Sequence, residues 1–383
     1  MEKKAVGLLG FGTVGKGAFQ VIRDWVPGLY VKKILARHVP EGMEGLVTTD
    51  PEEVLNDPEI CLIGEALPAG ETARVLVSEA LRRGKHVASA NKALVCAHFE
   101  ELHRIAGSSG AGLRFTPAAG GGIPWLVNLK RTLRADRVRS FRGIMNGTSN
   151  LILDAVQSRG IGYAEALAEA QAGGFAEADP SADVDGIDAR RKCAISAMIA
   201  FGCPVREEDI PTLGIRGISP EDAENFRELG RVCRLIARAE ESGGRICASV
   251  GPVLLGADAP ESRIRGSGNW FSLEAEAVGS LSFSGPGAGS LPTGQSLAQD
   301  LIDLAGPAPA GGNIVLSGRC RAGGDDSPWP WYLRAASFPE GLIQKRIGSA
   351  VLTRPLGTGE AVRLAEELRL KENGGFLAAC PED

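Results

Sequence analysis

The segment 173–192, GGFAEADPSADVDGIDARRK, carries five carboxylates followed by three basic side chains. Asp188 and Lys192 are four residues apart, so they share one face of the helix that we predict there. Glu177 lies upstream, on a predicted loop. A lysine beside a carbonyl group can donate a proton to it, and a nearby carboxylate can hold and orient that lysine. The segment therefore predicts an acid–base site for a small charged substrate.

The same acidic segment also has a purely structural interpretation. An i,i+4 acid–lysine pair on a solvated helix face contributes only about 0.3–0.5 kcal/mol, and acids at residues 179–185 would favour the positive end of a helix dipole. The sequence that follows, CAISAMIAF, is apolar on nearly every side, which is typical of a buried helix. A charged pair at the start of a buried helix favours the functional interpretation, and both remain open.

A second lysine, Lys92, follows Ser89-Ala90-Asn91 at the end of a predicted strand at 86–90. Ligands of open parallel sheets bind outside the carboxyl ends of the strands. Lys92 therefore lies at the edge where a ligand would bind. The alternative is a solvated loop lysine.

Residues 10–15, GFGTVG, form a G-x-G-x-x-G sequence between a predicted strand and a predicted helix. Gly10 would allow the tight turn, Gly12 would let the backbone approach a pyrophosphate, and Gly15 would let the helix pack on the strand. The alternative is a glycine turn without a ligand. The strand–helix context favours a dinucleotide site.

The second predicted strand ends in Ala36-Arg37-His38, without the acid that usually binds the ribose 2′-hydroxyl of NAD. Arg37 could instead hold a 2′-phosphate, because a planar guanidinium suits phosphate. The alternative is a solvated arginine at the end of a basic strand. We therefore expect NADP(H) to be preferred, with NAD(H) still possible.

The elements that would position these residues alternate between strands and helices in the first part of the chain, which predicts right-handed crossovers and a parallel sheet. The predicted strands there are 4–10, 29–37, 59–67 and 86–90, with helices from the glycine turn to about 24 and at 71–83. Further along, the sequence predicts strands at 137–145, 247–255 and 270–284, helices from 147, at 163–172, 188–201 and 295–304, and a tail of strand, strand, helix and strand over 331–383.

Composition sets the class of protein. The chain has 383 residues, 44% of them hydrophobic and 23% charged, which is a globular balance with room for two or three domains. A net charge of −5 argues against nucleic-acid binding. No run reaches about 18 apolar residues, so we expect no membrane span. We interpret the N-terminal apolar residues as a strand and not a signal peptide, the eight cysteines as free thiols, and the cytoplasm as the location.

Taken together, the motifs resemble the homoserine dehydrogenase family. They are GFGTVGKG at 10–17, SANKALV at 89–95, AGGGIP at 119–124, GIMNGTSNLIL at 143–153, GFAEADPSADVDGIDARRK at 174–192, and GPGAG at 285–289 followed by Thr293 and Asp300. They occur in the family's order over roughly residues 5–305. The resemblance implies reversible hydride transfer between L-aspartate 4-semialdehyde and L-homoserine, as part of threonine and methionine biosynthesis.

The resemblance also assigns roles to residues. Lys192 would be the proton donor, Asp188 would help hold the substrate, and Lys92 would lie between cofactor and substrate. Glu177 would bind the substrate ammonium and also touch the cofactor. Together with Arg37, the expected cofactor-binding residues are Gly10, Gly12, Thr13, Val14, Gly15, Lys92, Gly174, Glu177, Gly287 and Gly289. The family is usually dimeric or tetrameric, which implies a homodimer or homotetramer here.

Three departures from the family pattern stand out. Thr116 replaces the family's glutamate, which binds a monovalent cation with loop carbonyls; the carbonyls of Ala119, Gly121 and Ile123 remain, but the carboxylate does not. The family's third strand commonly ends in Glu-x-Gly-Gly, and Glu65-Ala-Leu-Pro-Ala-Gly matches it only in part. The tail begins like an ACT-type regulatory domain, yet its expected first helix is missing.

We therefore predict an α/β fold with a Rossmann-type NAD(P)-binding domain at 1–130, a mixed α+β catalytic and dimerisation domain at 131–305, a return segment at 306–330 and a short degenerate ACT-like tail at 331–383. Two other functions remain open. One is a same-family oxidoreductase acting on another amino-acid-derived carbonyl, which the change at Thr116 motivates. The other is a non-catalytic nucleotide-sensing protein, against which the intact acids and lysines argue.

Overall fold

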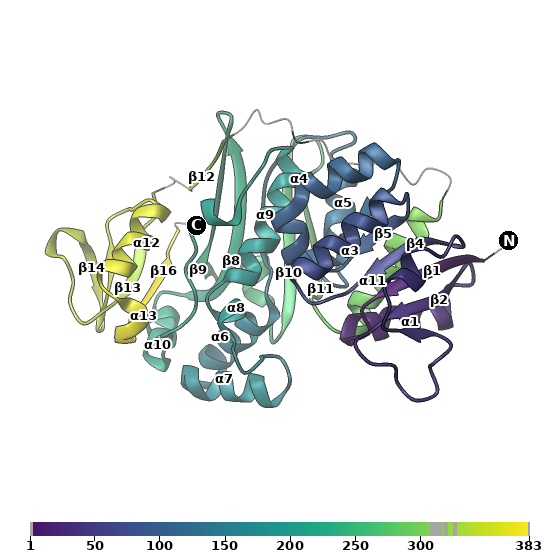
Figure 1. Ribbon diagram of the computed structural model, residues 1–383. Helices are drawn as coiled ribbons and strands as arrows, with labels where there is room; N and C mark the ends of the chain where they lie inside the picture. Colours follow the sequence, from purple (N-terminus) through teal and green to yellow (C-terminus); the bar gives the residue numbers. More distant parts are fainter. Residues whose placement is uncertain (1–2, 307–315, 317–320, 325–327, 382–383) are drawn as a thin grey trace. The chain divides into compact units, whose positions relative to one another are not determined.

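A computed structural model describes residues 3–306, 316, 321–324 and 328–381. The contacts between residues divide the chain (Figure 1) into two compact units. The first unit combines Met1–Arg131 with Pro286–Ser317. The second unit combines Thr132–Gly285 with Gly318–Asp383. None of the described helices is both long enough and apolar enough to span a bilayer. The predicted return segment 306–330 lies largely outside the described residues.

The first unit is built on a six-stranded sheet in which every pairing is parallel, as predicted, in the order β3-β2-β1-β4-β5-β6. Its strands are β1 (Lys4–Leu9), β2 (Leu29–Leu35), β3 (Val47–Thr48), β4 (Ile60–Glu65), β5 (His86–Ser89) and β6 (Leu113–Arg114). Its helices are α1 (Thr13–Trp25), α2 (Glu52–Leu55), α3 (Glu71–Arg82), α4 (Lys92–Ser109), η1 (Thr116–Ala118), α5 (Trp125–Thr132) and α11 (Ser290–Leu304).

Helix α11 joins this unit from a distant part of the sequence. Leu297 and Leu301 pack into the core that contains Val6 and Leu8 of β1. The helix also lies very close to α1, because a Cβ atom at Gly17 would stand only 2.0 Å from the Ser290 carbonyl oxygen. The predicted boundaries place residues 286–305 in the catalytic domain. In the structure these residues belong to the first unit, where α11 packs against the parallel sheet.

The second unit is built on a mixed sheet in the order β11-β10-β7-β8-β9-β16-β13-β15-β14, with β12 beside β9. Its strands are β7 (Val138–Ile144), β8 (Arg231–Ser242), β9 (Arg245–Gly256), β10 (Gly268–Ala275), β11 (Gly279–Pro286), β12 (Arg321–Gly324), β13 (Trp331–Arg334), β14 (Ile343–Ile347), β15 (Ala350–Thr353) and β16 (Phe376–Ala379). Its helices are α6 (Gly147–Arg159), α7 (Tyr163–Ala172), α8 (Ser181–Val184), α9 (Ile187–Phe201), η2 (Glu207–Asp209), α10 (Pro220–Glu228), η3 (Pro260–Arg263), η4 (Glu340–Leu342), α12 (Thr358–Glu367) and α13 (Leu370–Asn373).

Two features of this sheet differ from the prediction. The predicted strand region 270–284 is two neighbouring strands, β10 and β11, because Asp136 accepts the backbone N–H groups of Ala277 and Val278 and fixes a turn between them. Strand β8, which the sequence analysis did not predict, pairs with β9 along its whole length, from Arg231 opposite Gly256 to Ser242 opposite Arg245.

The C-terminal tail continues the second sheet. Strand β16 pairs with β9 at Ala379 and Val253. The tail has three strands before its first α-helix, not the two predicted, because β14 and β15 form a hairpin. Between β13 and β14 the structure has only the short helix η4. The guanidinium of Arg334 on β13 holds the fully buried carboxylate of Asp222 at 2.7 Å, which fixes the tail to α10.

Candidate active site

Lys192 and Asp188 form a buried pair on α9. The Lys192 Nζ atom lies 2.8 Å from Asp188 Oδ2 and donates to the Met145 carbonyl oxygen at 2.7 Å. The two residues are only 6% and 5% exposed, and α9 is buried on nearly every side. The pair is therefore not on a solvated face, and its geometry is fixed by an additional hydrogen bond, as a buried pair requires.

Asn146 connects this pair to the start of α6. Its side-chain oxygen accepts the Ser149 N–H at 2.8 Å and so caps the helix. Its amide nitrogen donates to Asp188 Oδ2 at 3.0 Å and to Asp183 Oδ1 at 2.6 Å. Asn146 belongs to the motif GIMNGTSNLIL, which assigns it no role of its own. An asparagine directly before a predicted helix indicates a helix cap. It does not predict the hydrogen bonds of Asn146 to Asp183 and Asp188.

Glu177 lies on the loop between α7 and α8. The Thr148 hydroxyl donates to the Phe175 carbonyl oxygen at 2.7 Å and holds this loop against the start of α6. The side chain of Glu177 is exposed, and no hydrogen bond or ion pair joins it to Asp188 or Lys192 in the described structure. Gly174, at the end of α7, has φ +73°, a conformation that favours glycine. The loop thus presents a free carboxylate to solvent.

Asp185, another acid of this segment, has a structural role. It accepts two hydrogen bonds from Arg216, at 2.6 and 3.0 Å, and one from Lys371 of the tail at 3.2 Å. Burial alone would raise the pKa of Asp185, but these two cations outweigh it and hold the pKa below its ordinary value. Within the acidic segment, Asp185 therefore fixes the backbone through Arg216 and Lys371, whereas the exposed carboxylate of Glu177 is available to a ligand.

The glycine turn of the first unit forms an open cradle at the start of α1. Gly10 has φ +103°, and a Cβ atom there would lie 2.5 Å from the Ala66 carbonyl oxygen. A Cβ atom at Gly15 would lie 2.1 Å from the Gly10 carbonyl oxygen, whereas at Gly12 nothing stands within 4 Å. The turn lies where the strand order reverses between β1 and β4. Open space before a helix N-terminus at this switch point fits a dinucleotide pyrophosphate.

Arg37 follows β2 by two residues and is exposed. No described residue forms an ion pair with it, in contrast to Lys32 and Lys33 of the same strand, which pair with acids. An exposed guanidinium at this position could hold a 2′-phosphate.

Lys92 is the first residue of α4, at the carboxyl edge of the parallel sheet, as predicted. Asn91 caps this helix by accepting the Leu94 N–H at 3.1 Å. Behind Asn91 lies Glu65, the last residue of β4, which has no exposed surface. Burial raises the pKa of Glu65 to about 7, although hydrogen bonds from Ser89, Leu67 and Asn91 oppose the rise. In the sequence, Glu65 belongs to a segment that matches the family motif only in part.

Two glycine-rich segments of the first unit pack against each other. The Gly122 N–H donates to the Pro286 carbonyl oxygen at 3.2 Å. Gly121 has φ +58°, and a Cβ atom there would lie 2.3 Å from the Gly287 carbonyl oxygen. Gly289, with φ +119°, precedes α11. Only glycine permits this close backbone contact.

The segment around Thr116, where the resemblance would place a monovalent cation, is held by hydrogen bonds within the first unit. Both the N–H and the hydroxyl group of Thr116 donate to the buried carboxylate of Asp300, each at 2.7 Å. The Ile123 carbonyl oxygen accepts the Trp125 N–H at 2.7 Å. Thr116 thus places a neutral hydrogen-bond donor, and no carboxylate, at this position. Among the described residues, no cluster of three or more His, Cys, Asp or Glu side chains could hold a metal ion.

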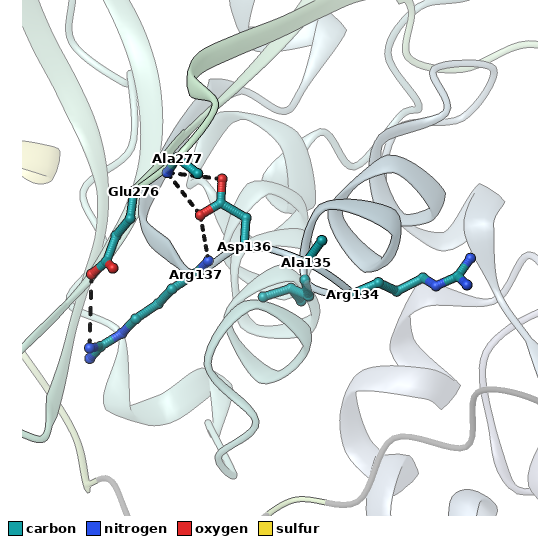
Figure 2. A pocket seen from close by; sticks show the side chains of 7 residues that line it. Arg134, Ala135, Asp136, Arg137, Glu276 and Ala277 are labelled. Atoms are coloured by element: carbon teal, nitrogen blue, oxygen red, sulfur yellow. Dashed lines mark hydrogen bonds and ion pairs between the residues drawn. The ribbon is translucent and has the colours of Figure 1, made fainter.

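A shallow pocket in the second unit contains none of the predicted site residues. It is lined by residues 133–137 with Glu276 and Ala277 (Figure 2). The Asp136 carboxylate accepts backbone N–H groups at the turn between β10 and β11, and Arg137 lies 3.9 Å from Glu276. The Asp136 carboxylate in this pocket is already bonded to the backbone of the turn, so we assign no ligand to the pocket.

Comparison with known proteins gives consistent matches along both units. The family profile described as homoserine dehydrogenase matches residues 124–302, and the one described as homoserine dehydrogenase, NAD binding domain, matches 10–116. The homoserine dehydrogenase of Bacillus subtilis is 38% identical over 315 residues, covering 79% of this chain and 73% of the relative. That of Mycobacterium tuberculosis is 37% identical over 366 residues, covering 90% and 80%.

Solved structures agree with these matches. A homoserine dehydrogenase from Thiobacillus denitrificans superposes with a TM-score of 0.89 at 29% identity, covering 100% of this chain and 99% of the other. A hyperthermophilic archaeal homoserine dehydrogenase in complex with NADPH gives a TM-score of 0.69 at 26% identity, covering 80% and 99%. These matches confirm the predicted combination of a parallel nucleotide-binding sheet and a mixed catalytic sheet.

Proposed function

Because this chain belongs to the homoserine dehydrogenase family of NAD(P)-dependent oxidoreductases, we propose that it interconverts L-homoserine and L-aspartate 4-semialdehyde with NADPH as its preferred cofactor. The observation that carries the proposal is the buried pair of Lys192 and Asp188. An ammonium group that is held by a carboxylate and a backbone carbonyl oxygen is oriented before the substrate arrives, which is what general acid catalysis requires.

In this proposal, Lys192 donates a proton to the carbonyl oxygen of the aldehyde as that oxygen gains negative charge. Asp188 orients the Lys192 ammonium group and helps to hold the substrate. In the reverse direction, Lys192 accepts the proton of the homoserine hydroxyl group. Asn146 is a positioning residue, because its amide group fixes Asp188 from α6.

Glu177 binds the ammonium group of the substrate in this proposal. Its carboxylate is exposed on a loop that Thr148 fastens to α6, the helix that Asn146 also joins to Asp188. A carboxylate with no cationic partner in the described structure is available for a charged amino group. Glu177 thus contributes binding, whereas Lys192 contributes chemistry.

NADPH supplies the hydride when it is bound. The cradle of Gly10, Gly12, Thr13, Val14 and Gly15 would hold its pyrophosphate, and Arg37 would hold its 2′-phosphate. By the family resemblance, Gly174, Glu177, Gly287 and Gly289 would also contact the cofactor. Lys92, at the carboxyl edge of β5, would lie between cofactor and substrate.

We further infer the setting of this activity from the family. The reaction serves threonine and methionine biosynthesis in the cytoplasm, and the protein acts as a homodimer or homotetramer. Residues 1–130 bind the nucleotide, residues 131–305 carry catalysis and dimerisation, and 331–383 form a reduced ACT-like tail. Size-exclusion chromatography with light scattering would test the oligomeric state directly.

A direct assay tests the proposed reaction. Purified protein is mixed with NADPH and L-aspartate 4-semialdehyde, and the loss of NADPH absorbance is followed alongside that with other small amino-acid-derived aldehydes. We expect the highest kcat/KM for aspartate semialdehyde. Because Thr116 changes a site that the family uses, a higher kcat/KM for another aldehyde would instead support the second candidate, a same-family enzyme for a different carbonyl substrate.

A further inference from the structure

We propose that Glu65 is a positioning residue for the reaction, and that its buried carboxyl group holds the turn that carries Lys92 through Ser89 and Asn91. This inference rests on the proposed function, since it assumes that Lys92 lies between the cofactor and the substrate. It adds to the predicted site a residue for which the sequence suggested no role.

Glu65 lies in the sheet between two segments that we propose to contact the cofactor, the glycine cradle after β1 and the turn after β5 that carries Lys92. Glu65 ends β4, where it pairs with Leu9 of β1 on one side and with Ser89 of β5 on the other. Leu9 directly precedes the glycine cradle, and Ser89 precedes Lys92 by three residues. Glu65 therefore lies at the switch point of the sheet, where open α/β sheets bind their ligands.

The hydrogen bonds of Glu65 lead directly to the first turn of α4. Its Oε2 accepts the Ser89 hydroxyl at 2.5 Å, and Ser89 Oγ in turn accepts the Asn91 N–H at 3.1 Å. Its Oε1 accepts the Leu67 N–H at 2.8 Å and the Asn91 amide at 3.4 Å. Asn91 caps α4, so the carboxyl group, the cap and the first helical residue form one connected unit.

The orientation of this network identifies where a proton would bind. The Asn91 side-chain oxygen already accepts the Leu94 N–H, so its amide nitrogen must be the group that faces Glu65. Among the described residues, Oε1 therefore accepts from two fixed N–H donors, whereas Oε2 accepts only from the Ser89 hydroxyl. A proton on Glu65 would sit on Oε2 and reverse the polarity of the bond to Ser89.

The surroundings of Glu65 provide no compensating charge within the described residues. Strand β4 contacts β1, β5 and α11, and Asn91, the cap of α4, bonds to Glu65. The titratable groups of these three elements and of the first residue of α4 are Lys4, His86, Lys92, Asp300 and Asp303. None of these contributes to the pKa of Glu65, which burial raises to about 7. A glutamine could make similar hydrogen bonds without the cost of burying a charge, so a carboxyl group here suggests that its charge is used.

The central test compares Glu65→Gln with wild-type protein across pH. Above about pH 7, where Glu65 is ionised, we expect the variant to have a kcat about tenfold lower, equivalent to a barrier about 1.4 kcal/mol higher, with a smaller change in KM. Below about pH 6 the two proteins should converge, because wild-type Glu65 is then protonated and neutral like glutamine. Ser89→Ala, which breaks the same connection, should also lower kcat.

A matched control is Glu59→Gln, which removes a carboxylate just before the opposite end of the same strand, where Glu59 is largely exposed. This control should keep the wild-type pH profile. A ratio of wild-type to Glu65→Gln kcat that stays constant from pH 6 to about pH 9 would overturn the proposal, because a merely structural residue would act equally at each pH.

A second measurement needs no activity and no cofactor. Hydrogen exchange of the Leu94 amide reports whether the Asn91 cap is formed. We expect faster exchange in Glu65→Ala than in wild-type protein and no change in Glu59→Gln. Unchanged exchange in Glu65→Ala would refute the positioning role even if the enzyme is active. If wild-type protein is inactive on homoserine but Glu65→Ala loosens the cap, the proposed function fails while the positioning role remains.

Discussion

The ammonium group of Lys192 lies 2.8 Å from the carboxylate of Asp188, one helical turn away on α9, and both side chains are buried. Removing either partner would leave an uncompensated charge in a region of low dielectric, which is strongly unfavourable. The Met145 carbonyl oxygen and the Asn146 amide hold the pair from outside α9. The pair is therefore preorganised by two elements, α6 and α9, and its effect on rate can be measured by substitution.

Lys192→Ala should lower kcat by about 10²–10⁴, the usual cost of removing a general acid. NADPH affinity should persist, because the glycine cradle lies in the other unit. Lys192→Arg should not restore the rate, since guanidinium holds its proton too tightly. Steady-state kinetics with a fluorescence titration of NADPH would check both. Near wild-type kcat in Lys192→Ala, together with an inactive Lys92→Ala, would mean that the two lysines exchange roles.

Glu177→Ala should act mainly on the KM for the substrate. An exposed carboxylate that binds the substrate ammonium does so in the ground state and in the transition state alike, so its loss weakens binding without slowing the chemical step. The control is Glu165→Ala, which removes another exposed carboxylate from α7. A large fall in kcat at saturating substrate would place Glu177 in the chemical step instead.

Arg37→Asp should weaken NADPH and spare NADH. The change removes a phosphate-binding guanidinium and adds a carboxylate of the kind that binds a ribose hydroxyl group. We expect KM for NADPH to rise about tenfold or more, a change of roughly 1.4 kcal/mol. Arg82→Asp makes the same charge change on the surface of α3 and should alter neither cofactor. Equal kcat/KM for both cofactors in wild-type protein would contradict the assignment of Arg37.

Thr116 predicts little activation by sodium or potassium. Its hydroxyl group and N–H already bind Asp300, so no carboxylate is offered to a cation. Thr116→Glu would bring a second carboxylate beside Asp300, and a bound cation would relieve their repulsion. We expect this variant to gain cation dependence. Rates measured at fixed ionic strength check both proteins, and a large increase for wild-type protein on adding either cation would count against the prediction.

The parallel sheet was predictable because its signals are local. The apolar strand KAVGLL, the glycine turn and the alternating helices each follow from short-range patterns. The acid–lysine face of α9 was predictable for the same reason, since four residues separate Asp188 and Lys192. Burial of that pair was not, because it depends on how other elements pack around α9.

Longer-range features were not predictable from these patterns. The Asn146 amide meets Asp183 and Asp188, which lie some forty positions later, only after α6 and α9 have packed. Helix α11 joins the first unit through close contact at Gly17, and one sequence cannot show which partner a helix with small residues will approach. Strand β8 did have a local signal, the Gly243-Gly244 pair, which is typical of a hairpin turn and has positive φ at both glycines.

The tail has features of a structural element more than of a ligand-binding domain. Its strand β16 extends the sheet of the second unit. Arg334 forms an ion pair with Asp222 of α10 and donates a hydrogen bond to the Gly217 carbonyl oxygen at 2.7 Å. Between β13 and β14 only the three residues of η4 are helical, so the layer that a second helix would add to a βαββαβ unit is missing.

On this basis we expect no strong inhibition by L-threonine. A small amino acid needs a concave site with converging polar groups. The tail sheet is accompanied only by α12, of ten residues, and α13, of four residues, among the described residues, and offers less of such a site. The check is kcat/KM for aspartate semialdehyde over a range of threonine concentrations, with L-serine as a matched amino acid. A micromolar inhibition constant for threonine that serine does not share would show that the shortened tail, or another part of the chain, still binds this effector.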